Sequence, residues 1–374
     1  MMMQRMQWRR QPEPQALNVA ALARIEGCTH PESADMLPDG EHVVFGNCAM
    51  TLGIAAYRGG KALVYVEGEA FISLARLTAA GVELVSRQHI TGQTATLGLD
   101  VLHRGTAMFP QGTVFQAAGG NPIVAPGDDR IANEPERLRS QALACDPIAG
   151  RVLGCVPLWA GTPIADKFNA FDQPNGLAIN AAGDLFVGDI PNGNPVDVLP
   201  PPAPSAVYRI PNASLDAISR CEPGSAVNVQ RILTPGFVNG VTVSPVDGLC
   251  WIVSCSSHDE AEGALYRLTD ADWDAGVLPE PAISGLGVLD GVCFTRRGTA
   301  FVTNPRTGEV IALLADGDHR VVMADGRPIA RNPADINVCY PAYRNGEPVL
   351  IVPDVSVAAA AGEGSVTFLD ISGL

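Results

Sequence analysis

The chain has 374 residues, of which 47% are apolar and 17% are charged, as in an ordinary folded protein. Chains of this length often form one domain when they are rich in strands, so we predict a single domain over residues 18–374 behind a disordered tail, residues 1–17. The formal net charge of −15 argues against nucleic acid or an anionic membrane as a partner.

The start of the chain is basic and has no apolar stretch behind its arginines. Arg5, Arg9 and Arg10 lie in a polar segment, which differs from a secretory signal. No apolar run reaches the about 20 residues that a membrane helix needs. The nine cysteines are scattered without CxxC spacing, which indicates reduced thiols and no zinc site. We therefore expect a cytoplasmic protein that does not associate with membranes.

Apolar strands and tight turns then alternate along the chain. A strand is expected over Val19–Glu26, and a first repeat opens at Glu32. Its outer strands are expected over Ala62–Val66 and Phe71–Leu77 because both segments are apolar.

A second, degenerate repeat opens near Leu97, with a turn at Arg104-Gly105 and a second strand over Thr106–Phe109. It has an apolar residue where the other repeats have a polar one. Four further repeats follow, and they open at these positions: Asn175, Asn239, Asp290 and a point near Asp335.

One phrase is common to the clearer repeats. A polar residue precedes an apolar strand, a tight turn follows, and a second apolar strand comes after the turn. The turn lies eight residues beyond each polar residue, as the pairs show: Glu32 and Gly40, Asn175 and Gly183, Asn239 and Asp247, Asp290 and Gly298. A constant offset from a hairpin turn means that these polar residues occupy the same place in each repeat.

Six units of short strands, with little helical periodicity, predict an all-β fold, a six-bladed β-propeller with a central metal site. A single blade cannot bury both faces of its sheet, so the blades must stack around an axis. The early strand over Val19–Glu26 would complete the last blade and close the ring.

The innermost strand of each propeller blade runs along the axis, so residues that precede these strands should meet at one mouth of the central channel. Four such residues carry oxygen atoms: Glu32, Asn175, Asn239 and Asp290. Carboxylate and amide oxygens are the ligands that Ca²⁺ prefers, and it accepts 6–8 of them. Asn-Gly and Asp-Gly also form ordinary turns, but here the hairpin turns lie eight residues further on. The pattern therefore favours a Ca²⁺ site, although another divalent cation would also fit.

With these four strand starts, the chain resembles the calcium-dependent six-bladed propellers of the senescence-marker/gluconolactonase, diisopropyl fluorophosphatase and paraoxonase group. The resemblance implies that Glu32, Asn175, Asn239 and Asp290 hold a catalytic calcium. Members of that group hydrolyse lactones, esters or phosphotriesters. At the first Asn, gluconolactonase-like members usually have Arg-x-Asn-Asp-Gly, whereas this chain has Gln173-Pro174-Asn175-Gly176, so a sugar-acid lactone is not expected.

We therefore expect a Ca²⁺-dependent hydrolase whose small-molecule substrate is a lactone or another ester. A phosphotriesterase that uses the same ion is an alternative. The Pro-Glu-Ser phrase around Glu32 also resembles strictosidine-synthase-like propellers, which share the fold and need no metal. A metal-free condensing or ligand-binding propeller is therefore the rival interpretation.

Two residues are candidates for proton transfer. Asp290 could act as base or nucleophile as well as ligand, and His258 lies on a loop after a second strand, which opens at the same mouth. His30 lies two residues before Glu32 and either borders the site or packs beside it. Residues that end second strands could orient the ligands, and these are Asp189, Ser254 and Asn304.

Overall fold

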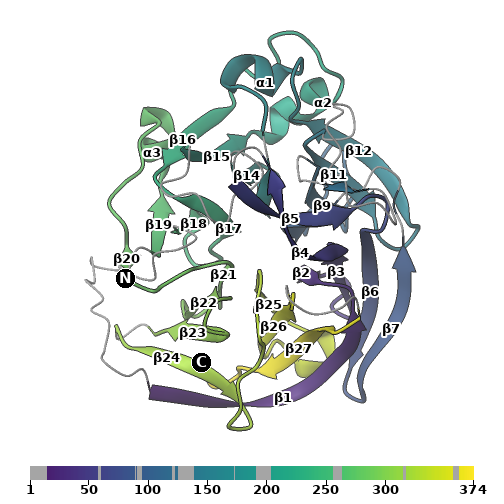
Figure 1. Ribbon diagram of the computed structural model, residues 1–374, viewed down its shortest axis with the longest axis vertical. Helices are drawn as coiled ribbons and strands as arrows, with labels where there is room; N and C mark the ends of the chain where they lie inside the picture. The colour runs from purple at the N-terminus through teal and green to yellow at the C-terminus, as the bar shows by residue number, and fades with distance from the viewer. Residues whose placement is uncertain are drawn as a thin grey trace.

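The computed structural model describes residues 15–57, 60–88, 90, 95–119, 123–124, 139–171, 173–190, 204–255, 263–314, 317–356 and 362–374. Its fold is all-β and propeller-like, with sheets arranged around a central axis (Figure 1). The helices of the described part are short: α1 Pro163–Phe168, α2 Asn212–Ser219, α3 Asp270–Ala275 and a 3₁₀ turn, η2, over Ala342–Arg344. None of the helices in the described ranges could span a membrane.

Four sheets are separate antiparallel blades of four strands each. The first two consist of β2 Pro31–Met36, β3 His42–Asn47, β6 Phe71–Thr78 and β7 Gly81–Gln88, and of β8 Leu99–Val101, β9 Val114–Ala118, β11 Gln141–Asp146 and β12 Arg151–Pro157. The next two consist of β13 Pro174–Ile179, β14 Leu185–Asp189, β15 Ser205–Ile210 and β16 Gln230–Thr234, and of β17 Phe237–Val243, β18 Cys250–Cys255, β19 Ala264–Leu268 and β20 Ile283–Ser284.

The remaining blade strands form one continuous eight-stranded sheet. In spatial order they are β21 Val292–Phe294, β22 Ala300–Asn304, β23 Glu309–Leu313, β24 His319–Ala324, β1 Gln15–Cys28, β27 Gly364–Asp370, β26 Val349–Asp354 and β25 Asn337–Cys339.

The long strand β1 is the reason for this continuity. Its first part, Gln15–Val19, pairs in parallel with β24, and its second part, Ala20–Cys28, pairs antiparallel with β27. The described part of the chain therefore has four separate blades, not the six that the repeats predicted. The expected strand over Val19–Glu26 also begins earlier, so residues 15–17 belong to β1 and not to a tail, while residues 1–14 lie outside the described ranges.

A small three-stranded sheet is formed by two insertions and is not part of any blade. It consists of β4 Met50–Tyr57, β5 Gly60–Val66 and β10 Ile123–Val124, with β4 antiparallel and β10 parallel to β5. The prediction that Ala62–Val66 is an outer blade strand was wrong, because β6 and β7 occupy the outer positions.

The second repeat also departs from its predicted pattern. Thr106–Phe109 is a turn and not a strand: the Phe109 N–H donates to Thr106 Oγ1 at 3.1 Å, and the Thr106 N–H donates to the Phe109 carbonyl at 2.8 Å. The second strand of this blade is β9, which follows the turn.

The apolar core lies between neighbouring sheets. Val207 of β15 and Ile252 of β18 are fully buried in one such layer, where the rings of Phe186 and Trp273 lie 5.7 Å apart. Because each sheet contributes an apolar face, the stacking of the sheets fixes where the inner strands begin around the axis.

Candidate functional site

The inner strands begin in close contact with one another around the axis. A Cβ atom on Gly176 would lie 2.3 Å from the Asn239 carbonyl oxygen, and one on Gly240 would lie 2.3 Å from the Asp290 carbonyl oxygen. Only glycine permits such an approach. In each of these repeats the polar residue supplies a side chain to the axis, and the glycine after it lets the backbone of the next inner strand come close.

The same contact continues around the axis. The Gly98 N–H donates to the Asn175 carbonyl at 3.1 Å, and the Asp335 N–H donates to the Glu32 carbonyl at 2.9 Å. A Cβ on Gly291 would lie 2.9 Å from the Ala334 carbonyl oxygen. We call the residues that begin the inner strands the axial ring, and they are, in order, Glu32, Leu97, Asn175, Asn239, Asp290 and Ala334.

Three members of the axial ring lie in β-bulges. The strand register shifts between Pro31 and Ala34, between Pro174 and Leu177, and between Val238 and Val241. A bulge leaves extra residues outside the regular ladder and redirects their side chains. Glu32, Asn175 and Asn239 are these extra residues, so the bulges allow them to leave the alternation of their strands.

A buried hydroxyl holds the strand start that carries Asp290. The Thr303 Oγ1 atom accepts a hydrogen bond from the Gly291 N–H at 2.7 Å and donates to the Ala334 carbonyl at 2.8 Å. Thr303 is fully buried and lies on β22. This bridge ties two neighbouring positions of the axial ring together.

The two amides of the ring contact each other directly. Asn175 Nδ2 donates to Asn239 Oδ1 at 2.6 Å, across a separation of 64 residues in the chain. Sequence analysis predicted that these side chains converge, and their hydrogen bond brings them together. An ion that used the Asn239 oxygen would replace this hydrogen bond.

The carboxylates of the ring are buried and close to each other. Glu32 is 6% exposed and Asp290 is 9% exposed. Burial, followed by the charges of Asp290 and Asp335, raises the pKa of Glu32 well above its usual value. Burial raises the pKa of Asp290 to about 7. Each shift reflects the cost of an ionised carboxylate in a site with little water.

One oxygen atom of Glu32 has no hydrogen-bond partner within the described residues. This atom, Oε2, is fully buried. A buried polar atom without a partner is costly, and a bound cation would remove this cost. The described ranges contain no three His, Cys, Asp or Glu side chains that could hold a metal ion together. The predicted set has two carboxylates, so a metal there would depend equally on the two amide oxygens. The donor set, all oxygen with two negative charges, fits Ca²⁺.

Sequence analysis missed a third carboxylate below the ring. Asp335 accepts a hydrogen bond from Ser33 Oγ at 3.0 Å, and both occupy the position that glycine takes in the other repeats. Burial, followed by the charge of Asp290, raises the pKa of Asp335 well above its usual value. The sixth repeat has Ala334 instead of a polar ring residue, so the repeated phrase did not identify Asp335 as part of the site.

The other predicted residues have different outcomes. His258 lies outside the described residues. His30 is buried with a left-handed φ of 52°, and its carbonyl accepts the Cys48 N–H at 3.1 Å. The Asp189 carboxylate accepts the Gln173 N–H at 3.0 Å, just before Asn175 in the chain.

The remaining two end second strands, as predicted. Ser254 is buried near the end of β18. Asn304 ends β22, but its Oδ1 atom accepts the N–H groups of Arg306 and Thr307, so it closes the following turn.

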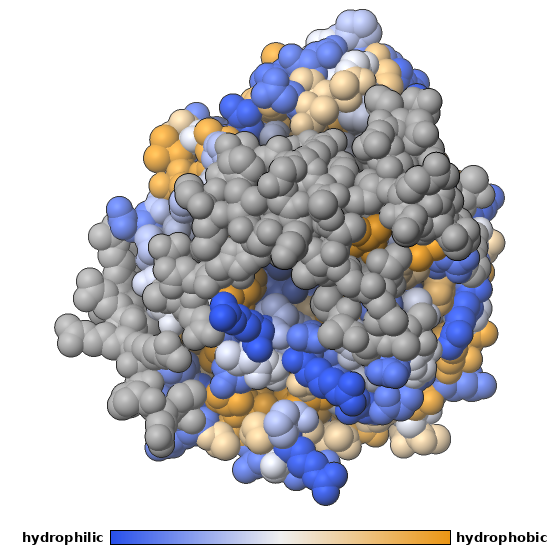
Figure 2. Space-filling model, viewed as in Figure 1, coloured by the Kyte–Doolittle hydropathy of each residue, from blue (hydrophilic) through white to orange (hydrophobic). Residues whose placement is uncertain are grey.

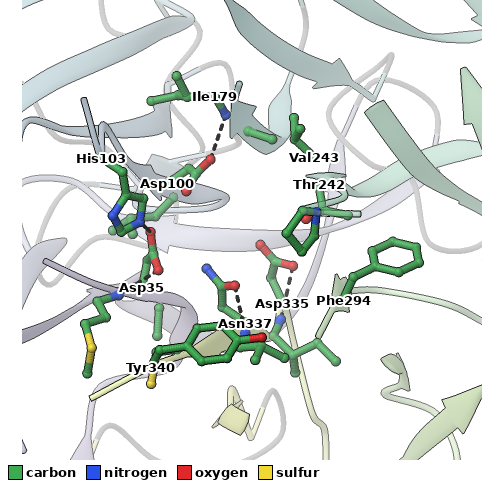
Figure 3. A pocket seen from close by; sticks show the side chains of 18 of the residues that line it. Asp35, Asp100, His103, Ile179, Thr242, Val243, Phe294, Asp335, Asn337 and Tyr340 are labelled. Atoms are coloured by element: carbon green, nitrogen blue, oxygen red, sulfur yellow. Dashed lines mark hydrogen bonds and ion pairs between the residues drawn. The ribbon is translucent and has the colours of Figure 1, made fainter. Parts of the chain in front are cut away.

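The inner strands run from the axial ring towards a cavity of about 360 Å³ at the other end of the axis. Figure 3 shows Asp35, Asp100 and His103 of this cavity directed towards one another. The Val101 N–H donates to Asp35 at 3.1 Å, and the Ile179 N–H donates to Asp100 at 2.6 Å. These carboxylates therefore join β2, β8 and β13 at the end opposite the ring.

Charge coupling in this cavity is strong. His103 Nε2 lies 3.5 Å from the Asp35 carboxylate, and that interaction raises the pKa of His103 to about 9. Burial, followed by the nearby charge of Asp35, raises the pKa of Asp100 well above its usual value. Since backbone N–H groups already occupy these carboxylates, their contacts are those of a structural polar network.

No protein-family model matches the chain, and no curated protein matches it. Several solved structures match the chain. A luciferin-regenerating enzyme matches with a TM-score of 0.54 and 10% identity, over 92% of each chain. A glucose dehydrogenase matches with a TM-score of 0.52 and 12% identity, over 94% of this chain and 98% of that chain. A gluconolactonase from Xanthomonas campestris matches with a TM-score of 0.47 and 13% identity, over 94% and 98%. The two matches with TM-scores above 0.5 show that this chain shares their fold, and at identities of 10–12% they show the fold alone.

Proposed function

We propose that the chain is a Ca²⁺-dependent hydrolase of a lactone or another carboxylic ester, with its site at the axial ring. The observation that carries the proposal is the buried Glu32 Oε2 atom without a partner in the described part, in a ring that also contains Asp290, Asn175 and Asn239. We also count the eight-stranded sheet as two blades joined by β1, which gives one ring position to each of six blades.

The residues that would hold the ion are Glu32, Asn175, Asn239 and Asp290. A bound Ca²⁺ polarises an ester carbonyl and stabilises the negative charge that develops on its oxygen. The four side chains supply fewer oxygens than the 6–8 that Ca²⁺ takes, which leaves room for water and substrate. Asp290, a buried carboxylate of the ring, would also act as the general base that takes a proton from the attacking water.

Apolar ring members flank one of the carboxylates. Leu97 and Ala334 lie on either side of Glu32 in the ring and are buried. They belong to one large apolar cluster. A weakly polar acyl or alkyl group of a substrate would fit this part of the ring better than a sugar would. The matched structures are named for enzymes that act on small molecules, which supports a small-molecule substrate.

The test is a substrate panel on metal-stripped protein, with lactones, aryl esters and phosphotriesters assayed with and without added Ca²⁺. We expect hydrolysis of lactones or esters that appears only with Ca²⁺ and is lost in Asn239→Ala. The matched control is Asn337→Ala, since this Asn lines the cavity at the other end of the axis. Activity that survives complete removal of divalent cations would refute the proposal.

A metal-free ligand-binding or condensing propeller is the second candidate. The observation that favours it is the Asn175–Asn239 hydrogen bond, which gives the Asn175 Nδ2 and Asn239 Oδ1 atoms a partner without an ion. Purified protein with no bound calcium, no calcium-dependent stabilisation and no hydrolysis on the panel would support this candidate.

A further inference from the structure

The chain segments that form the small sheet of β4, β5 and β10 leave the blades at the end of the axis where the axial ring lies. Asn47, the last residue of β3, pairs with Pro31 next to Glu32, and the chain continues from there into β4. β9 also ends beside the ring, because the Leu97 N–H donates to the Ala117 carbonyl at 3.1 Å, and the chain leads from there to β10. Two insertions from neighbouring blades thus meet beside the ring.

These insertions hold each other through backbone pairing. Tyr65 on β5 pairs with Met50 on β4 and with Ile123 on β10, and the Glu67 N–H donates to the Val124 carbonyl at 2.9 Å. Figure 1 draws β4 and β5 near the middle of the ring of sheets, and Figure 2 shows a hollow near the centre of the same face. The small sheet is therefore fixed against the mouth of the axis.

Tyr65 of this sheet shares an apolar cluster with members of the axial ring. It is 2% exposed, and it belongs to the apolar cluster that contains the ring members Leu97 and Ala334, together with Cys48. Tyr65 is therefore buried in the same apolar cluster as the positions that flank Glu32. The hydroxyl group of a buried tyrosine usually has a hydrogen-bond partner, and a bound substrate could supply one here.

The carboxylates of the ring act electrostatically on the Tyr65 phenol. Burial raises the pKa of Tyr65 well above its usual value, and the charges of Cys48, Glu32 and Asp290 raise it further. The backbone places Tyr65 beside this part of the ring: the Val66 N–H donates to the Ala49 carbonyl at 3.0 Å, and the Cys48 N–H donates to the carbonyl of His30, two residues before Glu32, at 3.1 Å. The Cys48 thiol is directed elsewhere, since its Sγ donates to the Thr96 carbonyl at 3.0 Å. Tyr65 is therefore a neutral hydrogen-bond donor at the mouth of the site.

We propose that Tyr65 is a substrate-contacting residue whose hydroxyl group donates a hydrogen bond to the carbonyl oxygen of an ester bound beside Glu32 and Asp290. This inference rests on the proposed hydrolase function. When water adds to the carbonyl carbon, the π-electron pair moves to the carbonyl oxygen. The phenol keeps its proton and strengthens its hydrogen bond to that oxygen. When the electron pair returns, the carbon–oxygen single bond of the ester breaks, and the released alkoxide takes the proton that the attacking water gave up.

The first arm of the test measures proximity without any turnover. Tb³⁺ binds the same oxygen ligands as Ca²⁺, and its luminescence is sensitised by aromatic side chains close to it. Tyr65→Phe should lose most of the sensitised emission while its Tb³⁺ affinity, measured by calorimetry, stays within about twofold of the parent. The matched control is Tyr208→Phe, a tyrosine of similar burial on β15 that stacks on Phe171 at 4.1 Å. It should keep the emission.

The second arm measures catalysis with Ca²⁺ on the best substrate of the panel. Tyr65→Phe should lower kcat by about 10²-fold, as the loss of one oxyanion donor does, with a smaller change in KM. Near-ultraviolet circular dichroism and thermal unfolding check that the variant is folded. Unchanged emission or unchanged kcat in folded Tyr65→Phe would overturn the assignment of Tyr65 alone. A parent protein that binds neither Tb³⁺ nor Ca²⁺ would overturn the proposed function and this assignment with it.

Discussion

Asn175 and Asn239 lie 64 residues apart in the chain, yet the amide of one donates a hydrogen bond of 2.6 Å to the amide of the other at the axis. Both residues lie near the start of an inner strand, and both are followed by a glycine against which the next strand packs. The contact therefore results from the repeat itself. Four of the repeats place a polar side chain at the same height on the axis, and neighbouring repeats bring the side chains of Asn175 and Asn239 together.

Replacing the carboxylate of Asp290 by an amide should have a different effect from replacing the amide of Asn175 by a carboxylate. Asp290→Asn keeps an oxygen ligand, so Ca²⁺ affinity should fall only modestly. Its kcat at saturating Ca²⁺ should fall about 10²–10⁴-fold, because the base is lost. Asn175→Asp adds a charge, should bind Ca²⁺ more tightly, and should turn over more slowly because the ion becomes a weaker Lewis acid. Calorimetric affinities and kcat at saturating Ca²⁺ separate these effects. If Asp290→Asn regains the full rate when Ca²⁺ is raised, Asp290 is a ligand only.

The close approach of strands at the axis should make its glycines sensitive to a single methyl group. A Cβ on Gly240 would lie 2.3 Å from the Asp290 carbonyl oxygen, so Gly240→Ala must push the two strands apart. We expect a loss of about 1–3 kcal/mol in the free energy of unfolding and weaker Ca²⁺ binding, because Asp290 moves with its strand. Gly373→Ala, with no atom within 4 Å of the new methyl group, is the control. Urea denaturation measures the free energy of unfolding of both variants. Equal stability of Gly240→Ala and Gly373→Ala would contradict the close packing of strands at the axial ring.

Stability should depend on pH through His103 at the opposite end of the axis. Its pKa is raised to about 9 in the folded protein, above the usual 6.5, by Asp35. The protonated imidazole therefore stabilises the fold below about pH 6.5, and this contribution disappears as the pH rises through 9. His103→Gln should lower the melting temperature at pH 6 and not at pH 10.

The size of this effect should be small, and salt should reduce it. The His103 side chain is 59% exposed, so we expect less than about 1 kcal/mol. A double-mutant cycle with Asp35→Asn isolates the pair. A melting-temperature difference between His103→Gln and the parent that is the same at pH 6 and pH 10 would show that the charge of His103 does not matter.

The sequence alone predicted the ring positions better than it predicted the sheets. The hairpin turn eight residues beyond Glu32, Asn175, Asn239 and Asp290 locks the register of each inner strand, so local spacing was sufficient to align them. The sixth repeat was placed near Asp335, but Asp335 was not recognised as a carboxylate of the site, because Ala334 carries no polar group and Asp335 stands where glycine stands elsewhere.

The wrong strand predictions concern segments whose pairing partners lie far away in the sequence. The segment Ala62–Val66 has the composition of a blade strand, but its partners are β4 and β10, and no local pattern distinguishes an insertion from a blade strand. The parallel pairing of Gln15–Val19 with β24 joins segments that are far apart in the chain, so it has no signature near either segment. Tyr65 reaches the site from that insertion, which is why the repeats did not reveal it.

The most direct test of the account is calorimetric titration of metal-stripped protein with Ca²⁺, together with its melting temperature. We expect a single bound Ca²⁺ and, at 100 times its Kd, about 2.7 kcal/mol of added stability. Glu32→Gln should weaken binding at least about tenfold, because it removes one of the two charges of the ring. Asp247→Asn, in the turn that follows β17, the strand containing Asn239, should bind as the parent does. No heat of binding and no shift in melting temperature in the parent, or equal losses in Glu32→Gln and Asp247→Asn, would contradict a calcium site at the axial ring.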